Sequence, residues 1–281
     1  MAGYDLHTHS TCSDGTLEPE AVARLAVERQ LGGIALTDHD TTAGVAAARA
    51  VAREHGVVVL TGCEFSAGHQ GNAVHVLGVG FDPGEARFAA ARAAVRGERL
   101  VRARRTVDRL RALGAEVTFE QVRALAAGES VGRPHIAQAM VEAGVVPSVQ
   151  EAFGPDWIGA GGRAYVPKQS VSPVRAVELI RGAGGVAILA HPSRHAGNRS
   201  VPEAVIREMV AAGLAALEAD HPDQPGPDRA HWRALAAELE VLTTGGSDDH
   251  GARSGYRLGV CRTSEATVAA LLAASPTASQ R

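Results

Sequence analysis

Short apolar runs alternate with amphipathic segments over the first third of the chain and again over its last third. The runs have the length and β-branched content of buried strands, and the segments between them place apolar residues on one helical face. This pattern predicts strands at Gly3–Leu6, Gly33–Thr37, Val57–Thr61, Ala73–Gly80, Val186–Ala190, Leu214–Leu217 and Val241–Thr244. It predicts helices at Glu18–Gln30, Thr42–His55, Pro173–Gly182, Val201–Ala212, Arg229–Glu240 and Ser264–Ala274.

The order of these elements indicates an α/β fold. Strands that alternate with helices predict a parallel sheet. Seven such units in one chain favour a closed, distorted (βα)7 barrel. An open, doubly wound sheet is the alternative.

The alternation stops between the fourth and fifth predicted strands, where residues 85–167 are mostly helical in pattern. We therefore expect a barrel domain of residues 1–95 and 168–281 with an inserted helical cap subdomain of residues 96–167. Residues 96–111 carry seven arginines against Glu98 and Asp108. A solvated, charged helix face is the general expectation for such a run. A cap that attracts an anionic substrate is the alternative.

Composition narrows the class of protein. The chain has 281 residues, of which 45% are hydrophobic and 21% are charged, which is typical of a soluble globular protein. Aromatic residues make up only 4% and the net charge is -3, which argues against a platform of stacked aromatics or a polycationic surface for nucleic acid. No apolar run approaches membrane-spanning length. We expect a cytoplasmic protein that needs no membrane and no obligate protein partner.

The three cysteines stand far apart without a CxxC pair, so neither a disulfide framework nor a thiolate zinc site is expected. The twelve histidines are the unusual count. Many of them, with several acids, follow predicted strands, and the carboxyl ends of barrel strands meet on one face. The candidates from six strands are His7, His9, Asp14, His39, Glu64, His75, His191, Asp248 and His250. Imidazole and carboxylate ligands suit Mn, Zn or Fe, and nine ligands imply two or three divalent ions.

The runs DLHTHSTCSDGTLEP, TDHDT, AHP and SDDH, with Glu64 and His75, resemble the PHP (polymerase and histidinol phosphatase) superfamily over about residues 1–95 and 168–260. The resemblance implies a (βα)7 barrel with a trinuclear metal site. The implied ligand sets are His7, His9, Glu64 and Asp248 for the first metal, Glu64, His75 and His191 for the second, and Asp14, His39 and His250 for the third. Glu64 would bridge two metals.

The GRPHIA run at Gly132–Ala137 and the helical insertion resemble the stand-alone phosphoesterases of this superfamily. The activity implied is hydrolysis of a nucleotide phosphomonoester: a nucleoside 5′-monophosphate, a 3′,5′-bisphosphate or a short RNA 5′ end. A metal-bridging hydroxide would attack phosphorus while metals and arginines neutralise the equatorial oxygens. The alternatives are a histidinol-phosphate phosphatase, a proofreading exonuclease module and a metal-dependent amidohydrolase.

Further residues are candidates for the reaction itself. We expect catalytic roles for Glu64, Asp248, His221 and His195, and substrate contacts from Arg133, His135, Lys168 and Arg194. Helix capping is the alternative role for Arg133 and His135, which lie in the insertion. A position in a surface loop, without substrate contact, is the alternative for Arg194 and His195. Asp38 and Asp40 could orient ligand imidazoles or cap a loop. Trp157 and Tyr165 could stack on a base or pack the insertion.

Overall fold

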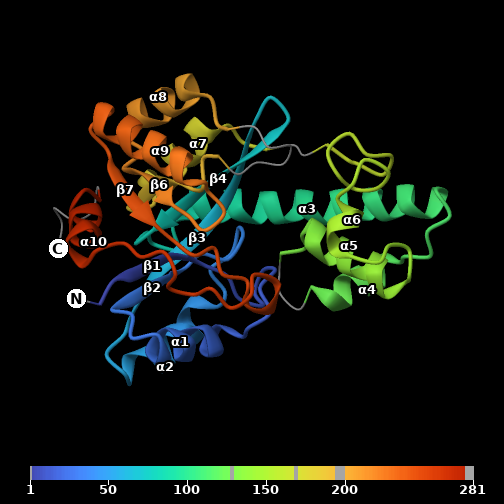
Figure 1. Cartoon of the computed structure of the whole chain (residues 1–281), viewed down its shortest axis with the longest axis horizontal. Helices are drawn as coiled ribbons and strands as arrows, with labels where there is room; N and C mark the ends of the chain where they lie inside the picture. The colour runs from blue at the N-terminus through green and yellow to red at the C-terminus, as the bar shows by residue number, and fades with distance from the viewer. Residues whose placement is uncertain (1, 127–129, 168–169, 194–199, 276–281) are drawn as a thin grey trace.

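The computed structural model describes residues 2–126, 130–167, 170–193 and 200–275. Lys168 and Arg194, predicted to contact substrate, and His195, predicted to be catalytic, lie outside these ranges. In Figure 1 the sheet and its surrounding helices lie at the left, and a smaller helical unit lies at the right. One long helix joins the two parts.

The sheet follows chain order. Its strands are β1 (Tyr4–Thr8), β2 (Gly33–Leu36), β3 (Val58–His69), β4 (Asn72–Val79), β5 (Val186–Leu189), β6 (Ala216–Asp220) and β7 (Leu242–Gly245). A bridge from Thr8 to Asp249, beyond the end of β7, brings the two edges together, and the His9 backbone N–H donates to the Asp249 carbonyl at 2.9 Å. The seven-stranded sheet is therefore a nearly closed barrel, which confirms the predicted fold class.

Helices on the outside of the barrel match the predicted amphipathic segments to within a few residues. They are α1 (Pro19–Glu28), α2 (Val45–Arg53), α7 (Pro173–Gly182), α8 (Glu203–Ala211), α9 (Gly226–Glu238) and α10 (Glu265–Ala273). The α-helices of the insertion are α3 (Ala86–Ala112), α4 (Phe119–Leu125), α5 (Arg133–Glu142) and α6 (Val149–Ala152). No helix in the described ranges is long and apolar enough to cross a bilayer.

The expectation of an all-parallel sheet is wrong for β4, which pairs antiparallel with both β3 and β5. Strand β3 does not end at Thr61 but continues to His69 and turns at once into β4. The two turn residues, Gln70 and Gly71, have φ of 49° and 81°. A two-residue hairpin of this kind needs positive φ at both positions, and it joins strands only in antiparallel fashion. Glu64 therefore lies within β3 rather than after it.

The predicted domain boundary at residue 96 falls inside a continuous helix, because α3 runs unbroken from Ala86 to Ala112. Phe88 and Val95 on its first half are buried in the barrel core, whereas Val107 and Leu110 on its second half are buried in the core of the insertion. The helix thus belongs to both hydrophobic cores. We use "cap" below for residues 113–167 with the second half of α3.

Candidate active site

The loop after β1 is shaped by Asp38, which lies just beyond β2. Its carboxylate accepts hydrogen bonds from the Ser10 backbone N–H at 2.8 Å and from the hydroxyls of Ser10 and Ser13, each at 2.6 Å. These contacts fix the backbone around His9. Of the two roles considered for Asp38, the structure shows the loop-capping one.

Asp40, with φ of 59°, likewise contacts the backbone. Its carboxylate accepts from the Ser66 N–H at 2.7 Å and pairs with Arg99 Nε at 2.6 Å. Since Arg99 belongs to α3, this buried pair ties the long helix to the loop that carries His39.

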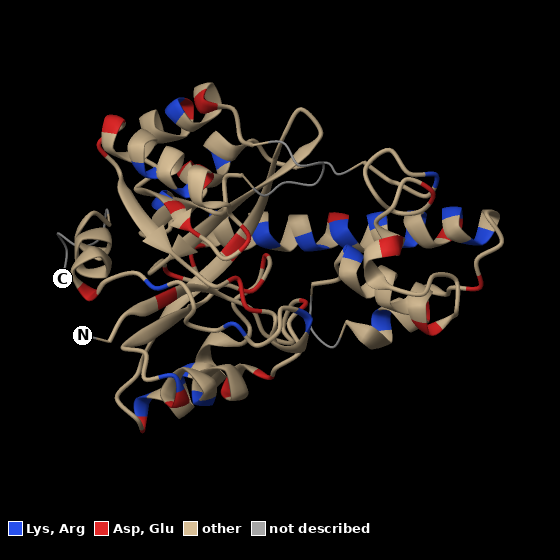
Figure 2. Ribbon diagram, viewed as in Figure 1, with Lys and Arg blue, Asp and Glu red and all other residues tan. Residues whose placement is uncertain are grey.

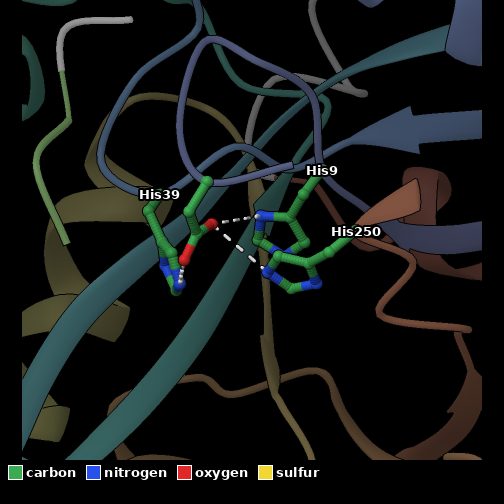
Figure 3. Close-up of side chains that lie close together, drawn as sticks. His9, His39 and His250 are labelled. Atoms are coloured by element: carbon green, nitrogen blue, oxygen red, sulfur yellow. Dashed lines mark ion pairs between the residues drawn. The ribbon is translucent and has the colours of Figure 1, made fainter. Parts of the chain in front are cut away.

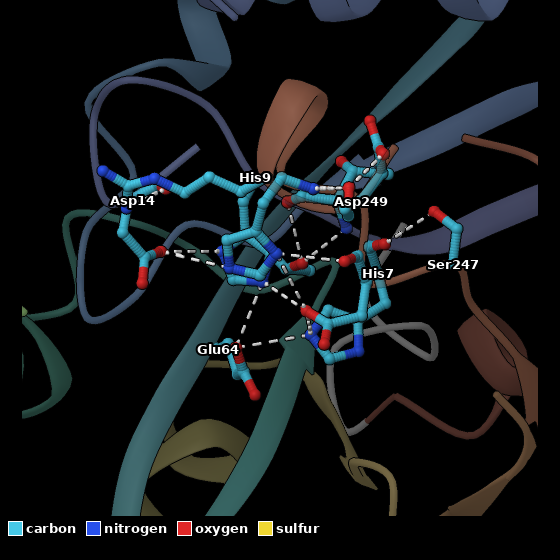
Figure 4. A network of polar contacts seen from close by, with 12 residues as sticks. His7, His9, Asp14, Glu64, Ser247 and Asp249 are labelled. Atoms are coloured by element: carbon cyan, nitrogen blue, oxygen red, sulfur yellow. Dashed lines mark hydrogen bonds and ion pairs between the residues drawn. The ribbon is translucent and has the colours of Figure 1, made fainter. Parts of the chain in front are cut away.

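Glu64 is 1% exposed, and Figure 4 shows it below His7 and His9, to which dashed lines join it. Its Oε2 lies 3.2 Å from His9 Nε2 and His39 Nδ1 and 3.3 Å from His7 Nε2. Its Oε1 lies 2.7 Å from His75 Nδ1 and 3.1 Å from His191 Nε2. The two oxygens therefore face different groups of imidazoles. This is the arrangement required of a carboxylate that bridges two ions.

His75 reaches the site from an unexpected direction. On antiparallel β4 it opposes Ser66 of β3, and Ser66 shares a strand face with Glu64 two residues earlier. The argument that strand carboxyl ends converge does not apply to this residue. It is the hairpin register that brings His75 to Glu64.

Two further carboxylates complete the cluster. Asp248 Oδ1 lies 3.2 Å from His9 Nε2 and 3.4 Å from His7 Nε2. Asp14 Oδ1 lies 3.2 Å from His250 Nε2, and Figure 3 shows His9, His39 and His250 around this second carboxylate. Asp248 and His191 have φ of 49° and 26°, a region that non-glycine residues rarely occupy. Such strain is concentrated at functional sites.

Two observations indicate that these residues can form a metal centre. His7 Nε2, His9 Nε2, His39 Nδ1 and Asp14 Oδ1 are buried and have no hydrogen-bond partner among the described residues. Buried polar atoms are costly unless they are satisfied, so four such atoms in one cluster indicate a missing ligand. In addition, three overlapping groups place their ligand atoms within 4.8 Å of one another: His7, His9, Glu64 and Asp248; His9, Asp14, His39 and His250; and His39, Glu64 and His75.

These groups can be compared with the sets implied by the family resemblance. The first set is reproduced completely, and the third is reproduced with His9 added. In the second, His39 takes the place of His191, although His191 Nε2 still lies 3.1 Å from the bridging Glu64. All nine residues therefore come together, and imidazole with carboxylate is a donor set suited to Mn, Zn or Fe.

The pKa values of the clustered imidazoles and carboxylates depend strongly on one another. Burial by itself raises the pKa of Glu64, but the imidazoles of His75, His39 and His7 outweigh this and hold that pKa well below its usual range. Burial likewise opposes the charge on His9, yet Asp248 and Glu64 raise its pKa to about 10. The pKa of His39 falls to about 3 because burial dominates there. The carboxylates thus stay ionised, as metal ligands must be.

Glu218 is a residue to which the sequence assigned no role. It is completely buried on β6, and its Oε1 lies 3.0 Å from His7 Nδ1. Its Oε2 accepts a hydrogen bond from the His191 backbone N–H at 2.8 Å. A carboxylate behind a ligand histidine fixes the tautomer and orientation of the ring. The available signal was an acid between two apolar residues, Leu217 and Ala219, within the strand Ala216–Asp220.

Glu218→Gln is expected to weaken metal binding about 10- to 100-fold, because the amide no longer orients His7 as a carboxylate does. Metal affinity can be measured by competition with a chromogenic chelator. Glu208→Gln, on outer helix α8, is the matched control and should bind metal as the wild type does. Unchanged affinity in the Glu218 variant would show that this carboxylate serves only to fill the core.

His221 was expected to have a catalytic role, but the structure places it behind a candidate ligand. It is fully buried and does not line the pocket described below. Its Nε2 lies 3.4 Å from Asp248 Oδ2, and its Nδ1 accepts from the Asp223 N–H at 3.1 Å. This position supports a role in holding Asp248 rather than proton donation to a substrate.

A pocket of about 330 Å³ opens above the cluster, between barrel and cap. Its floor includes Asp14, His39, Glu64, His75, His191, Asp248 and His250. Its other wall comes from the cap and includes Arg99, Arg102, Arg133, Phe153 and Tyr165. The insertion therefore covers the candidate metal centre with a cationic surface.

The other candidate residues of the insertion fall into two groups. Some line the pocket, where they can contact substrate, and others cap a helix or pack inside the insertion. Arg133 lines the pocket, and its guanidinium lies 5.5 Å from the Phe153 ring centroid. His135 is 2% exposed, and its Nδ1 accepts from the Gly132 N–H at 3.0 Å, which is the helix-capping role. Tyr165 lines the pocket, whereas Trp157 packs against the cap core.

Comparison with known proteins agrees with this geometry. A family model described as "PHP domain" matches residues 5–136. The chain is 37% identical to a 3′,5′-nucleoside bisphosphate phosphatase of Chromobacterium violaceum over 92% of this chain and 90% of that protein. It is 34% identical to a 5′-3′ exoribonuclease of Haemophilus influenzae over 88% of this chain and 89% of that one.

A solved structure from Bifidobacterium adolescentis, assigned as a metal-dependent phosphoesterase, superposes with a TM-score of 0.90 at 34% identity. The superposition covers 100% of this chain and 99% of the other. Barrel, clustered ligands and these relatives together define a metal-dependent phosphoester hydrolase. The chain belongs to the PHP family.

Proposed function

We propose that this hydrolase removes a phosphoryl group from nucleotides that carry a second phosphate, namely nucleoside 3′,5′-bisphosphates and short RNA 5′ ends. The observation that carries the proposal is the two-sided pocket, with candidate metal ligands on its floor and arginines on its other wall. A monophosphate needs only the floor. The named activities of the two relatives, on a nucleoside bisphosphate and on RNA, are both hydrolyses of a nucleotide phosphoester.

The cationic wall supports this choice because two of its arginines have no carboxylate partner in the described part of the chain. Among the described residues, no carboxylate pairs with Arg102 or Arg133 within ion-pair distance, although Arg99 pairs with Asp40. Burial, with the nearby Arg99 and Arg133, lowers the pKa of Arg102 to about 10. Clustered cations of this kind are stabilised by an anion, and a guanidinium fork binds phosphate through two hydrogen bonds.

The nine histidine and carboxylate residues would hold two or three divalent ions, with Glu64 bridging two of them. When bound, such ions act as Lewis acids on the phosphoryl oxygens and lower the pKa of water toward neutrality. Glu218 and His221 orient His7 and Asp248. Arg133 and Arg102 hold the second phosphate, so that the scissile phosphoester lies over the floor.

A phosphate-release assay with Mn or Zn tests the proposal across four substrates. A nucleoside 3′,5′-bisphosphate and a 5′-phosphorylated oligoribonucleotide are expected to give higher kcat/KM than a nucleoside 5′-monophosphate or histidinol phosphate. A preference for histidinol phosphate would overturn the nucleotide assignment. Equal rates with the mono- and bisphosphate would overturn the role of the second phosphate.

Arg133→Ala is expected to lower kcat/KM for the bisphosphate about 10- to 100-fold through KM, with metal content unchanged. The reason is that a charge-assisted hydrogen bond to phosphate contributes about 1.5–3 kcal/mol. Steady-state kinetics and elemental analysis measure the two quantities. Arg123→Ala, exposed on α4, is the control. If Arg133→Ala lost metal or unfolded, its role would be structural.

A further inference from the structure

A second groove of about 270 Å³ lies along α3 and continues from the active-site pocket. It is lined by Val95, Glu98, Arg99, Val101, Arg102, Arg105, Arg109, Val166 and Pro167. Arg99 and Arg102 line both hollows. A ligand that leaves the active site along the helix would therefore enter this groove.

The arginines of the groove form one stripe. Residues 99, 102, 105 and 109 recur at near-helical spacing, so their side chains leave the same side of α3. Figure 2 shows arginines all along this helix. At 1.5 Å per residue the stripe is about 15 Å long, which is long enough to contact a few consecutive phosphates of a single strand.

The side chains that line the groove carry a net positive charge, even when the lining carboxylate is included. Glu98 is the carboxylate among its lining residues, set against four arginines. In the described part of the chain, no carboxylate lies within ion-pair distance of Arg102 or Arg105. Arg109 donates a hydrogen bond to the Tyr165 carbonyl, which leaves its charge uncompensated. A solvated helix face stabilised by internal ion pairs would need more acids than α3 carries.

The exposure of the arginines changes along the stripe. Arg99 is 8% exposed and is anchored to Asp40, beside the candidate ligand His39. Arg102 is half-buried, and Arg105 and Arg109 are exposed. The stripe therefore begins at the metal centre and opens into solvent. Val101, which is 43% exposed, and Val166 and Pro167 supply an apolar rim beside the charges.

These features together match a single-stranded nucleic acid, which presents regularly spaced phosphates on one side and apolar base faces on the other. We propose that the α3 groove binds the nucleotides that follow the 5′-terminal one in an RNA substrate. This inference rests on the proposed function and adds a binding site for the nucleotides that follow the RNA 5′ end. The expected reach is about two to four nucleotides beyond the scissile one.

Arg105→Glu provides the test, because this exposed side chain lies in the groove but outside the active-site pocket. KM for phosphate release is measured with a nucleoside 3′,5′-bisphosphate and with a 5′-phosphorylated octaribonucleotide. The charge reversal is expected to raise KM about tenfold for the octamer, since each exposed charge contributes up to about fivefold, and to leave the bisphosphate unaffected. Arg104→Glu, on the same helix but outside both hollows, is the matched control.

Fluorescence anisotropy measures the binding of an octaribonucleotide that phosphorothioate linkages protect from hydrolysis. Because no hydrolysis is needed, this measurement tests the groove independently of the proposed function. The affinity for the octamer should fall with salt, and Arg105→Glu should reduce the slope of log K against log salt by about 0.7 or more. The groove is excluded if the wild type binds dimers and octamers equally, or if Arg104→Glu and Arg105→Glu have equal effects. Length-dependent binding without bisphosphate hydrolysis would retain the groove and overturn the assigned substrate.

Discussion

Glu64→Gln is expected to reduce kcat about a thousandfold and to lower the metal content of the purified protein. The substitution keeps the size of the side chain but removes its charge and replaces one carboxylate oxygen with an amide NH2 group. The two oxygens of Glu64 face five imidazoles in two groups. The amide is therefore expected to weaken the binding of both ions that the carboxylate would bridge. Losing that support costs several kcal/mol of transition-state stabilisation, and about 4 kcal/mol corresponds to a thousandfold.

Elemental analysis and phosphate-release kinetics on the same preparation measure both effects. Glu178→Gln is the control, because that glutamate is 48% exposed in an ion pair with Arg175 on α7. Its metal content and kcat should stay at wild-type values. A Glu64 variant that retained full metal content and near wild-type turnover would contradict the bridging role.

Removal of metal by a chelator is expected to abolish hydrolysis and to lower the thermal midpoint by roughly 5–10 °C. A ligand at a hundred times its Kd stabilises the folded state by about 2.7 kcal/mol, and 1 kcal/mol shifts Tm by about 2–4 °C in a protein of this size. The physical cause is visible in the cluster, where His7 Nε2, His9 Nε2 and Asp14 Oδ1 are buried without hydrogen bonds.

Thermal melts before chelation, after chelation and after adding back Mn or Zn measure this effect. Recovery of both Tm and activity identifies the ions that the site accepts. The metal-free chain should keep its secondary structure, since the barrel and cap each have an apolar core of their own. Activity that survives complete chelation would contradict the metal-dependent mechanism.

Much of the barrel follows from local pattern. Helix α7 was expected at Pro173–Gly182 and lies there, and β2 and β5 end within one residue of their expected ends. Buried strands and amphipathic helices leave a periodic signal that survives in one dimension. The nine candidate ligands were also found this way, since eight of them lie on or after parallel strands that open on one face.

What local pattern did not reveal depends on pairing between distant segments. The antiparallel course of β4, which carries His75, depends on a hairpin whose turn joins two strands expected to be separate. The continuous α3 belongs to two cores, and neither core is visible from the helix alone.

The sequence alone therefore identified the candidate metal ligands, because the carboxyl ends of barrel strands bring side chains to one face regardless of which distant residues pack around them. It did not identify the contacts that orient these ligands. Glu218 meets His7 across 211 positions, and Asp40 meets Arg99 across 59. Such pairs form only when burial removes water from both partners, and that burial is a property of the packed barrel and cap, not of any segment.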